Sequence, residues 1–346
     1  MRKLIILLLF TFMLSTPVAA QELTPPQVPE SGKAYIQEDA RTLEEGLSHL
    51  VKQAIKLLRP DLAEAGKISL AVVAAVLMVG ILQTCTNGAT HTSDFAGAVI
   101  IVSLLLTNTN SMIRLSTETI KEMSEYGKLL LPVMTAAMAA QGGITSSAAL
   151  CGGTALFGSV LSNLISGLFV PMVYFFLALS AAGGALGENL LIRLRDLIKG
   201  FLGWCLKTLL TVFTTYMGIT GVLSGSTDAA ALKAAKVTIS TFVPVVGGIL
   251  SDASEAVLVS AGLARNAAGL YGILAILALF VAPFVKIGTH YLLLKATAGI
   301  CSLFGTKRMC EVVADFSSAM GLLLGMTGSA CLLQLISTIC FMKGVS

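Results

Sequence analysis

The sequence predicts an all-α, polytopic helical membrane protein with about six to eight spans. Hydrophobic residues make up 55% of the 346 residues and charged residues only 12%, about half the charged fraction of soluble domains. The mean hydropathy is +0.86. Several runs without Asp, Glu, Lys or Arg reach the roughly 20 residues that a membrane-spanning helix needs. Together these observations exclude a water-soluble globular domain.

The first 20 residues have the pattern of a secretory signal peptide. Arg2 and Lys3 precede an apolar stretch from Leu4 to Leu14, and Val18-Ala19-Ala20 offers a small-residue cleavage site. An uncleaved signal anchor is the alternative. Either interpretation exports the segment that follows.

Residues 21–66 are predicted to be extracytoplasmic, because they carry 13 of the 42 charged side chains. A proline-rich stretch is followed by an amphipathic helix that we expect Pro60 to end. This helix can lie on the outer membrane face, bind a partner helix or pack against its own protein. Its apolar residues recur at helical spacing: Leu43, Leu47, Leu50, Val51, Ala54 and Leu58.

Residues 67–346 form the predicted multi-span domain. A charge at the bilayer centre costs roughly 2.5–3.5 kcal/mol on insertion scales, so charge-free runs mark the spans. Whether residues 129–187 hold one span or two is left open by the sequence. The crossings are expected near 68–86, 95–113, 160–183, 203–224, 266–285 and 316–341.

Two basic loops set the expected orientation, since Lys and Arg gather on the cytoplasmic side of short loops. Arg193, Arg195 and Lys199 lie in one loop, and Lys307 and Arg308 in the other. Starting outside the membrane, the six crossings then alternate inward and outward. This alternation of six crossings is consistent with the basic loops only if two Gly-Gly segments enter the membrane and return to the outer side.

These two segments suggest an internal duplication, with repeats about 129–224 and 241–341 and two re-entrant Gly-Gly breaks. Each has a proline followed by a glycine pair. Backbone that leaves helical geometry inside hydrocarbon needs protein or water for its hydrogen bonds, so paired breaks indicate a transport pathway. Close helix packing by small residues is the alternative. The predicted pathway or hinge residues are Pro132, Gly142, Gly143, Pro244, Gly247, Gly248 and Asp252.

Four further charges flank the second break and are candidates for a polar interface. Lys233 and Lys236 share one helix face. Asp228 precedes them and Glu255 follows the break. At membrane depth such groups are functional candidates, whereas at the outer interface they are ordinary.

No pattern for catalysis, a cofactor or a metal ion is found. The three histidines, His49, His91 and His290, are far apart, and the sequence has neither HExxH nor a Walker lysine loop. The seven cysteines form no CxxC motif and lie mostly in apolar runs. Scattered bases with few aromatic residues argue against nucleic-acid binding. A non-enzymatic protein is therefore expected.

One block carries a family resemblance. Residues 221–258 contain, in order, K-x-x-K, V-P-V-V-G-G and S-D, and "GLYGILAILALFVAPFVKIGTHYLLLKATAGI" follows. This block resembles the stage III sporulation protein AE family of endospore-forming bacteria. The layout of signal peptide, exported segment and multiple spans is similar too.

The resemblance implies a multi-pass protein of the mother-cell membrane that faces the forespore and is needed for forespore development. Its implied partners are other stage III sporulation membrane proteins, including a cytoplasmic ATPase and intermembrane ring proteins. The chain itself is then expected to be a channel or export-gate-like core subunit. A stand-alone secondary transporter and a membrane scaffold are the alternatives.

Overall fold

The computed structural model describes residues 26–36, 42–85, 90–140, 144–219 and 267–345. Within these ranges every regular element is a helix, which confirms the predicted all-α class. The elements are α2 (Glu30–Lys33), α3 (Leu43–Cys85), α4 (Thr90–Ala140), α5 (Ile144–Leu164), the π-helical turn η1 (Ile165–Phe169), α6 (Val170–Leu186), α7 (Asn189–Ile219), α10 (Ala267–Cys301) and α11 (Lys307–Val345).

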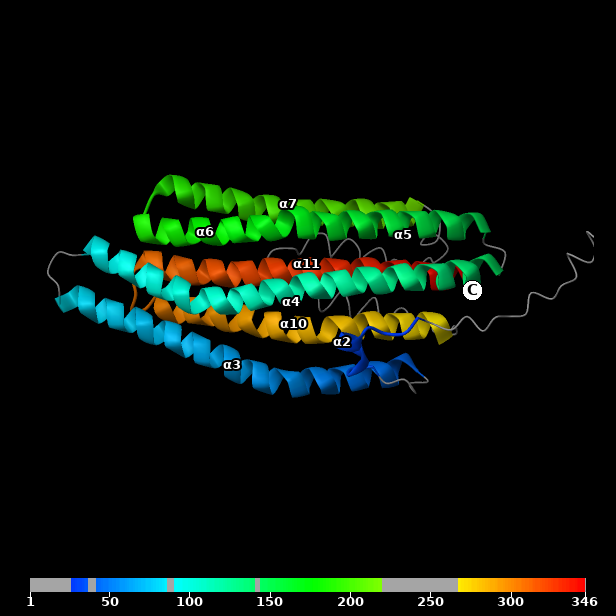
Figure 1. Cartoon of the computed structure of the whole chain (residues 1–346), viewed down its shortest axis with the longest axis horizontal. Coiled ribbons are helices and arrows are strands. Elements are labelled where there is room, and N and C mark those ends of the chain that lie inside the picture. Colours follow the sequence, from blue (N-terminus) through cyan, green and yellow to red (C-terminus); the bar gives the residue numbers. More distant parts are fainter. Residues whose placement is uncertain (1–25, 37–41, 86–89, 141–143, 220–266, 346) are drawn as a thin grey trace, which may run out of the picture.

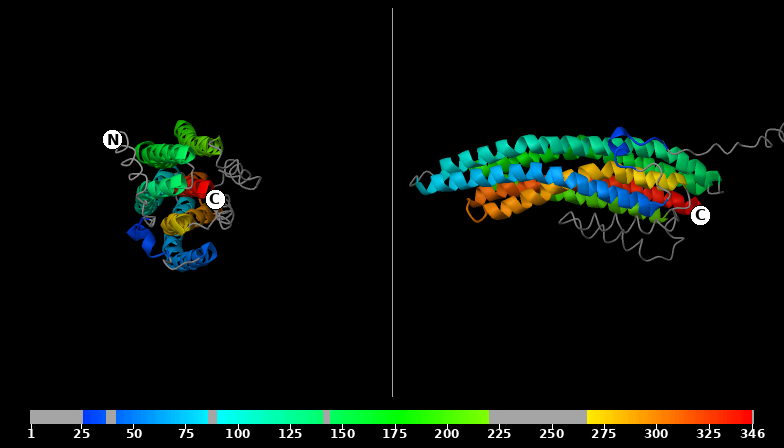
Figure 2. Two further views of the ribbon diagram at one scale, coloured as in Figure 1. Left: turned by 90° about the vertical axis from the view of Figure 1, so that its right-hand side faces the viewer. Right: turned by 90° about the horizontal axis from the view of Figure 1, so that it is seen from below.

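The helices form an elongated bundle in which successive long helices run in opposite directions (Figure 1). The connections α6–α7 and α10–α11 lie at one end, and the C terminus lies at the other. At the first end α3 and α4 extend beyond the other helices (Figure 2). Both predicted groups of basic residues lie near this end, but Arg193, Arg195 and Lys199 lie inside α7 rather than in a loop, and Lys307 and Arg308 begin α11.

Six described helices are long and apolar enough to cross a membrane, in agreement with the predicted multi-pass architecture. Residues 144–186 form a single rod of α5, η1 and α6, which contains one candidate span, Ser147–Leu186. The π-turn stands directly before Pro171, and such turns are common where a helix is interrupted. The candidate spans are Leu43–Gln83, Phe95–Met138, Ser147–Leu186, Asn189–Gly218, Ala268–Cys301 and Lys307–Met342.

Helix α11 is the central element of the bundle. It packs against α10, α4, α6, α5 and α7. Of the residues in its most apolar 18-residue stretch, 89% are buried. Its large side chains Phe316, Leu323 and Phe341 are fully buried. The other long helices are arranged around this core.

The expected helix end at Pro60 is wrong, and α4 likewise continues past Pro132. Pro60 lies inside α3, which continues to Cys85, and Pro132 lies inside α4, which continues to Ala140. A proline removes one backbone donor, but neighbouring helices can stabilise a long helix on both sides of it. The amphipathic helix of the exported segment and the first span are therefore one continuous helix.

Small residues allow close contacts at selected positions only. A Cβ atom at Gly184 of α6 would overlap Val312 of α11, whereas one at the adjacent Gly183 would meet Ile192 at an ordinary 3.7 Å. Gly187 ends α6 with φ 73°, a conformation that favours glycine. The packing role of small residues thus applies at Gly184, where α6 approaches α11.

Candidate functional site

Helix α4 continues through a charged stretch that lies between two apolar ones. Residues 114–128 contain six charged side chains, yet the helix is unbroken because one of its faces is apolar throughout. Ile113, Ile120, Met123 and Leu130 recur at spacings of three or seven residues, and all four are buried. This periodicity fixes α4 to the core as an amphipathic helix.

The opposite face of α4 is polar and exposed. Its residues are spaced by three or four, so they lie in one line along the helix. Arg114 pairs with Glu118 at 3.7 Å and Lys121 with Glu125 at 4.0 Å. We call this line the polar face of α4: Thr107, Ser111, Arg114, Glu118, Lys121 and Glu125.

The short helix α2 is attached beside the polar face of α4. Ser31 of α2 donates a hydrogen bond to the carboxylate of Glu122 on α4. A Cβ atom at Gly32 would lie only 3.0 Å from the side chain of Leu279, so α2 also packs closely on α10. Helix α2 therefore joins the predicted exported segment to α4 and α10. The exported segment is thus part of the bundle in the described range 26–36.

The neighbouring helices α5–α7 expose apolar side chains at the same level. Tyr174 of α6 lines the same cavity as Arg114, and its neighbours Leu168 and Phe175 are 42% and 52% exposed. We define the apolar face of α5–α7 by its exposed large side chains: Leu156, Val160, Leu168, Phe175, Trp204 and Val212.

This asymmetry restricts what can surround the protein. Four charges of the polar face facing hydrocarbon would cost about 10 kcal/mol or more before pairing is counted. Pairing would offset only part of this cost, because repayment of charge desolvation needs close contacts and these ion pairs are 3.7 and 4.0 Å long. The polar face of α4 is therefore suited to water or to another protein, and the apolar face of α5–α7 to lipid.

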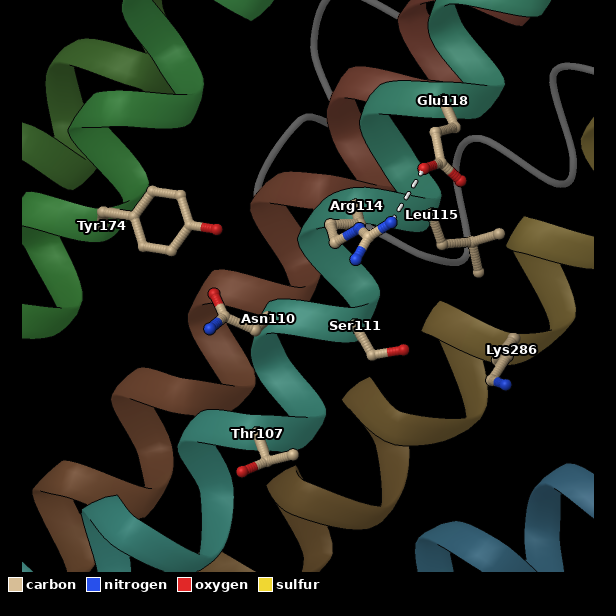
Figure 3. A pocket seen from close by; sticks show the side chains of 8 residues that line it. All are labelled: Thr107, Asn110, Ser111, Arg114, Leu115, Glu118, Tyr174 and Lys286. Atoms are coloured by element: carbon tan, nitrogen blue, oxygen red, sulfur yellow. Dashed lines mark ion pairs between the residues drawn. The ribbon is translucent and has the colours of Figure 1, made fainter.

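A cavity of about 580 Å³ lies where the polar face begins. Figure 3 shows α4 in the middle, with Tyr174 of α6 on one side and Lys286 of α10 on the other. Glu118 and Leu115 complete the wall. Its hydrogen-bond donors and cations are Thr107, Asn110, Ser111, Arg114, Tyr174 and Lys286.

A second polar cluster connects three helices near the end with the two groups of basic residues. The Arg195 guanidinium of α7 donates to the Asp315 carboxylate of α11 at 2.7 Å, and the Ser180 hydroxyl of α6 donates to the same oxygen at 2.6 Å. The side chains of Arg195 and Asp315 are 12% and 10% exposed. Lys199 donates to Ser318 nearby at 2.9 Å. This is a buried, well-paired cluster.

Helices α3 and α10 bring further ionisable groups together beside the cavity. Lys286 lies 3.8 Å from Glu64, and Asp61 is within electrostatic range of Lys286 and His290. His290 is only 1% exposed. Its Nδ1 lies 2.8 Å from the Lys286 carbonyl oxygen, and its Nε2 has no partner within the described ranges.

The residues singled out from the sequence are placed as follows. Pro132 lies in the interior of α4, and its role as a hinge stays a prediction. The others lie outside the described residues, so their proximity is untested: Gly142, Gly143, Asp228, Lys233, Lys236, Pro244, Gly247, Gly248, Asp252 and Glu255.

Sequence reasoning missed the polar face of α4 because charge was taken as the end of a span. The apolar spacing from Ile113 to Leu130 was the available signal. No local signal existed for the pairing of Asp315 with Arg195, since these residues are 120 positions apart.

Comparison with known proteins gives one family. The model described as stage III sporulation protein AE matches residues 32–344. Among curated proteins, the stage III sporulation protein AE of Bacillus subtilis (strain 168) is 23% identical over 260 residues. The match covers 74% of this chain and 65% of that relative. No solved structure matches.

Proposed function

Because the chain belongs to the stage III sporulation protein AE family, we propose that it is a membrane core subunit, channel-like or export-gate-like, of the sporulation channel complex. Family membership supports a role in sporulation. The proposal adds a location in the mother-cell membrane that faces the forespore, and a non-catalytic role. It also adds partners: a cytoplasmic ATPase that supplies energy, and ring proteins in the intermembrane space.

One observation carries this proposal. The polar face of α4 is exposed over several helical turns of a candidate membrane span, while the apolar face of α5–α7 is exposed at the same level. Charged residues in membrane spans generally face a water-filled cavity or another protein. In the proposed assembly, the apolar face of α5–α7 contacts lipid and the polar face of α4 faces the pathway.

The buried cluster of Arg195 and Asp315 is the feature on which the alternative of a secondary transporter would rest. Coupled transporters use ionisable groups within the membrane to bind the driving ion, and Asp315 is such a group. Its direct pairing at 2.7 Å and its hydrogen bond from Ser180 make it better suited to holding helices together. For this reason the channel subunit is the leading proposal.

Thiol labelling tests the proposed role of the polar face. Single cysteines at Arg114, Glu118 and Lys121, in a variant without the seven native cysteines, should react with a membrane-impermeant maleimide in the assembled complex. Matched cysteines at Val160 and Leu168 should react at least tenfold more slowly, because lipid covers them.

Two other outcomes would count against the pathway. Labelling of the α4 positions only after the partners are removed would show that a partner covers the polar face, which makes the chain a scaffold. If the α4 cysteines reacted as slowly as those at Val160 and Leu168 in every preparation, both faces would lie in lipid, and this result would contradict the proposal.

A further inference from the structure

The cavity between α4, α6 and α10 has the features of a binding site rather than of a packing defect. It has about 580 Å³ of space, far more than a single water molecule needs. Its walls come from three helices, and two of them contribute a cation to the lining, Arg114 of α4 and Lys286 of α10 (Figure 3).

Both cations are available to a ligand. Arg114 is 3.7 Å from Glu118 and Lys286 is 3.8 Å from Glu64, and both distances exceed those of a hydrogen bond between such groups. The paired carboxylate side chains are 65% and 55% exposed, so they can turn toward water. The buried Arg195, by contrast, donates directly to Asp315 at 2.7 Å.

The uncharged polar groups of the cavity are also available. Thr107, Ser111, Asn110 and Tyr174 have no side-chain hydrogen-bond partner among the residues that the structure describes. Neighbouring hydroxyl groups on the same helix behave differently, because Ser103 and Thr109 donate to backbone carbonyls at 2.8 Å. The cavity thus holds four unpartnered donor groups and two loosely paired cations.

The cavity also lies where the surface changes from apolar to polar. The exposed large residues of α4 before Thr107 are Phe95, Val99, Ile100, Leu104 and Leu106. On α3, an apolar stretch of about 27 Å begins directly after Lys67. Apolar side chains that can contact acyl chains therefore lie beside polar groups that can contact a phosphate.

We propose that this cavity binds the phosphate group of a membrane phospholipid. The phosphate oxygens accept hydrogen bonds from Arg114 and Lys286, and the hydroxyl and amide groups complete the shell. The acyl chains lie along the apolar part of α4, beside Leu104 and Leu106. Basic pockets between membrane helices recognise lipid headgroups by this chemistry.

The test measures lipid retention by native mass spectrometry on the full chain in detergent supplemented with phosphatidylglycerol. We expect one retained lipid per chain in the unmodified protein. Retention should fall at least tenfold in the double variant Arg114→Gln/Lys286→Gln. The matched control Lys121→Gln/Lys128→Gln removes two exposed cations outside the cavity and should retain lipid like the unmodified protein.

A second variant covers the case in which the double variant fails to fold. Ser111→Trp adds an indole at an exposed position on the cavity wall and should also reduce retention at least tenfold without removing any charge. Equal retention in all four proteins would overturn the proposal.

Competition separates the two sources of phosphate. Inorganic phosphate at millimolar concentration should leave the lipid bound, because it lacks the acyl chains. Stoichiometric displacement of phosphatidylglycerol by inorganic phosphate would instead make a soluble phosphate the ligand and overturn the lipid assignment. The result does not depend on whether the polar face of α4 lines a pathway.

Discussion

Arg195→Met should lower the free energy of unfolding by about 3–5 kcal/mol, the cost of removing one partner from a buried ion pair. The Asp315 carboxylate, 10% exposed, would keep only the Ser180 hydroxyl as a direct partner. Since whole proteins are stable by about 5–15 kcal/mol, this is a large share of the total, and the amount of protein in the membrane at 37 °C should fall. Titration with SDS in mixed micelles measures the change.

The double variant Arg195→Met/Asp315→Leu is the control. It removes both charges, so it should recover most of the stability, because apolar replacement of a buried pair is often neutral or stabilising. Recovery of both stability and sporulation would show that the cluster connects α6, α7 and α11 structurally. A stable double variant that no longer supports sporulation would favour the ion-coupled transporter.

The positions of the membrane helices were predictable because the cost of burying charge in lipid is a property of each segment alone. The expected crossings near 68–86 and 316–341 fall inside α3 and α11. The two groups of basic residues also lie near one end of the bundle. Their common location was predictable because Lys and Arg act locally on insertion.

The lengths of the helices were not predictable in this way. The charges of residues 114–128 and the prolines at 60 and 132 mark boundaries in an isolated chain. In the bundle, the buried face of α4 against α11 outweighs them, so a helix of 51 residues results. Local preferences are weak compared with packing along a whole helix.

The candidate site was less predictable than the fold. The cavity combines residues of α4 with Tyr174 and Lys286, which are distant in sequence and have no shared motif. Asn110 was visible only as a polar residue in an expected span. The glycine pairs that suggested a pathway fall outside the described residues, so the duplication and the pathway role remain predictions.

Gly184→Ala should destabilise the protein by up to about 2 kcal/mol, because overpacking a core usually costs about 1–3 kcal/mol and the gain in helix propensity offsets about 1 kcal/mol of it. The new methyl group would overlap Val312, which is 1% exposed and β-branched, so its side chain has little freedom to move away. The greater helix propensity of alanine, worth about 1 kcal/mol, opposes this loss without removing the overlap. The midpoint of thermal unfolding in detergent reports the net effect.

Gly183→Ala is the matched control on the same helix. Its methyl group would meet Ile192 at 3.7 Å, an ordinary contact, so the gain in helix propensity should leave the protein as stable as before or slightly more stable. The opposite signs at adjacent glycines follow from the direction in which each Cβ points. Equal effects at both positions would mean that α6 does not approach α11 closely at Gly184. In that case the helix contact that places Ser180 against Asp315 would be wrong as well, since both depend on the same packing of α6 on α11.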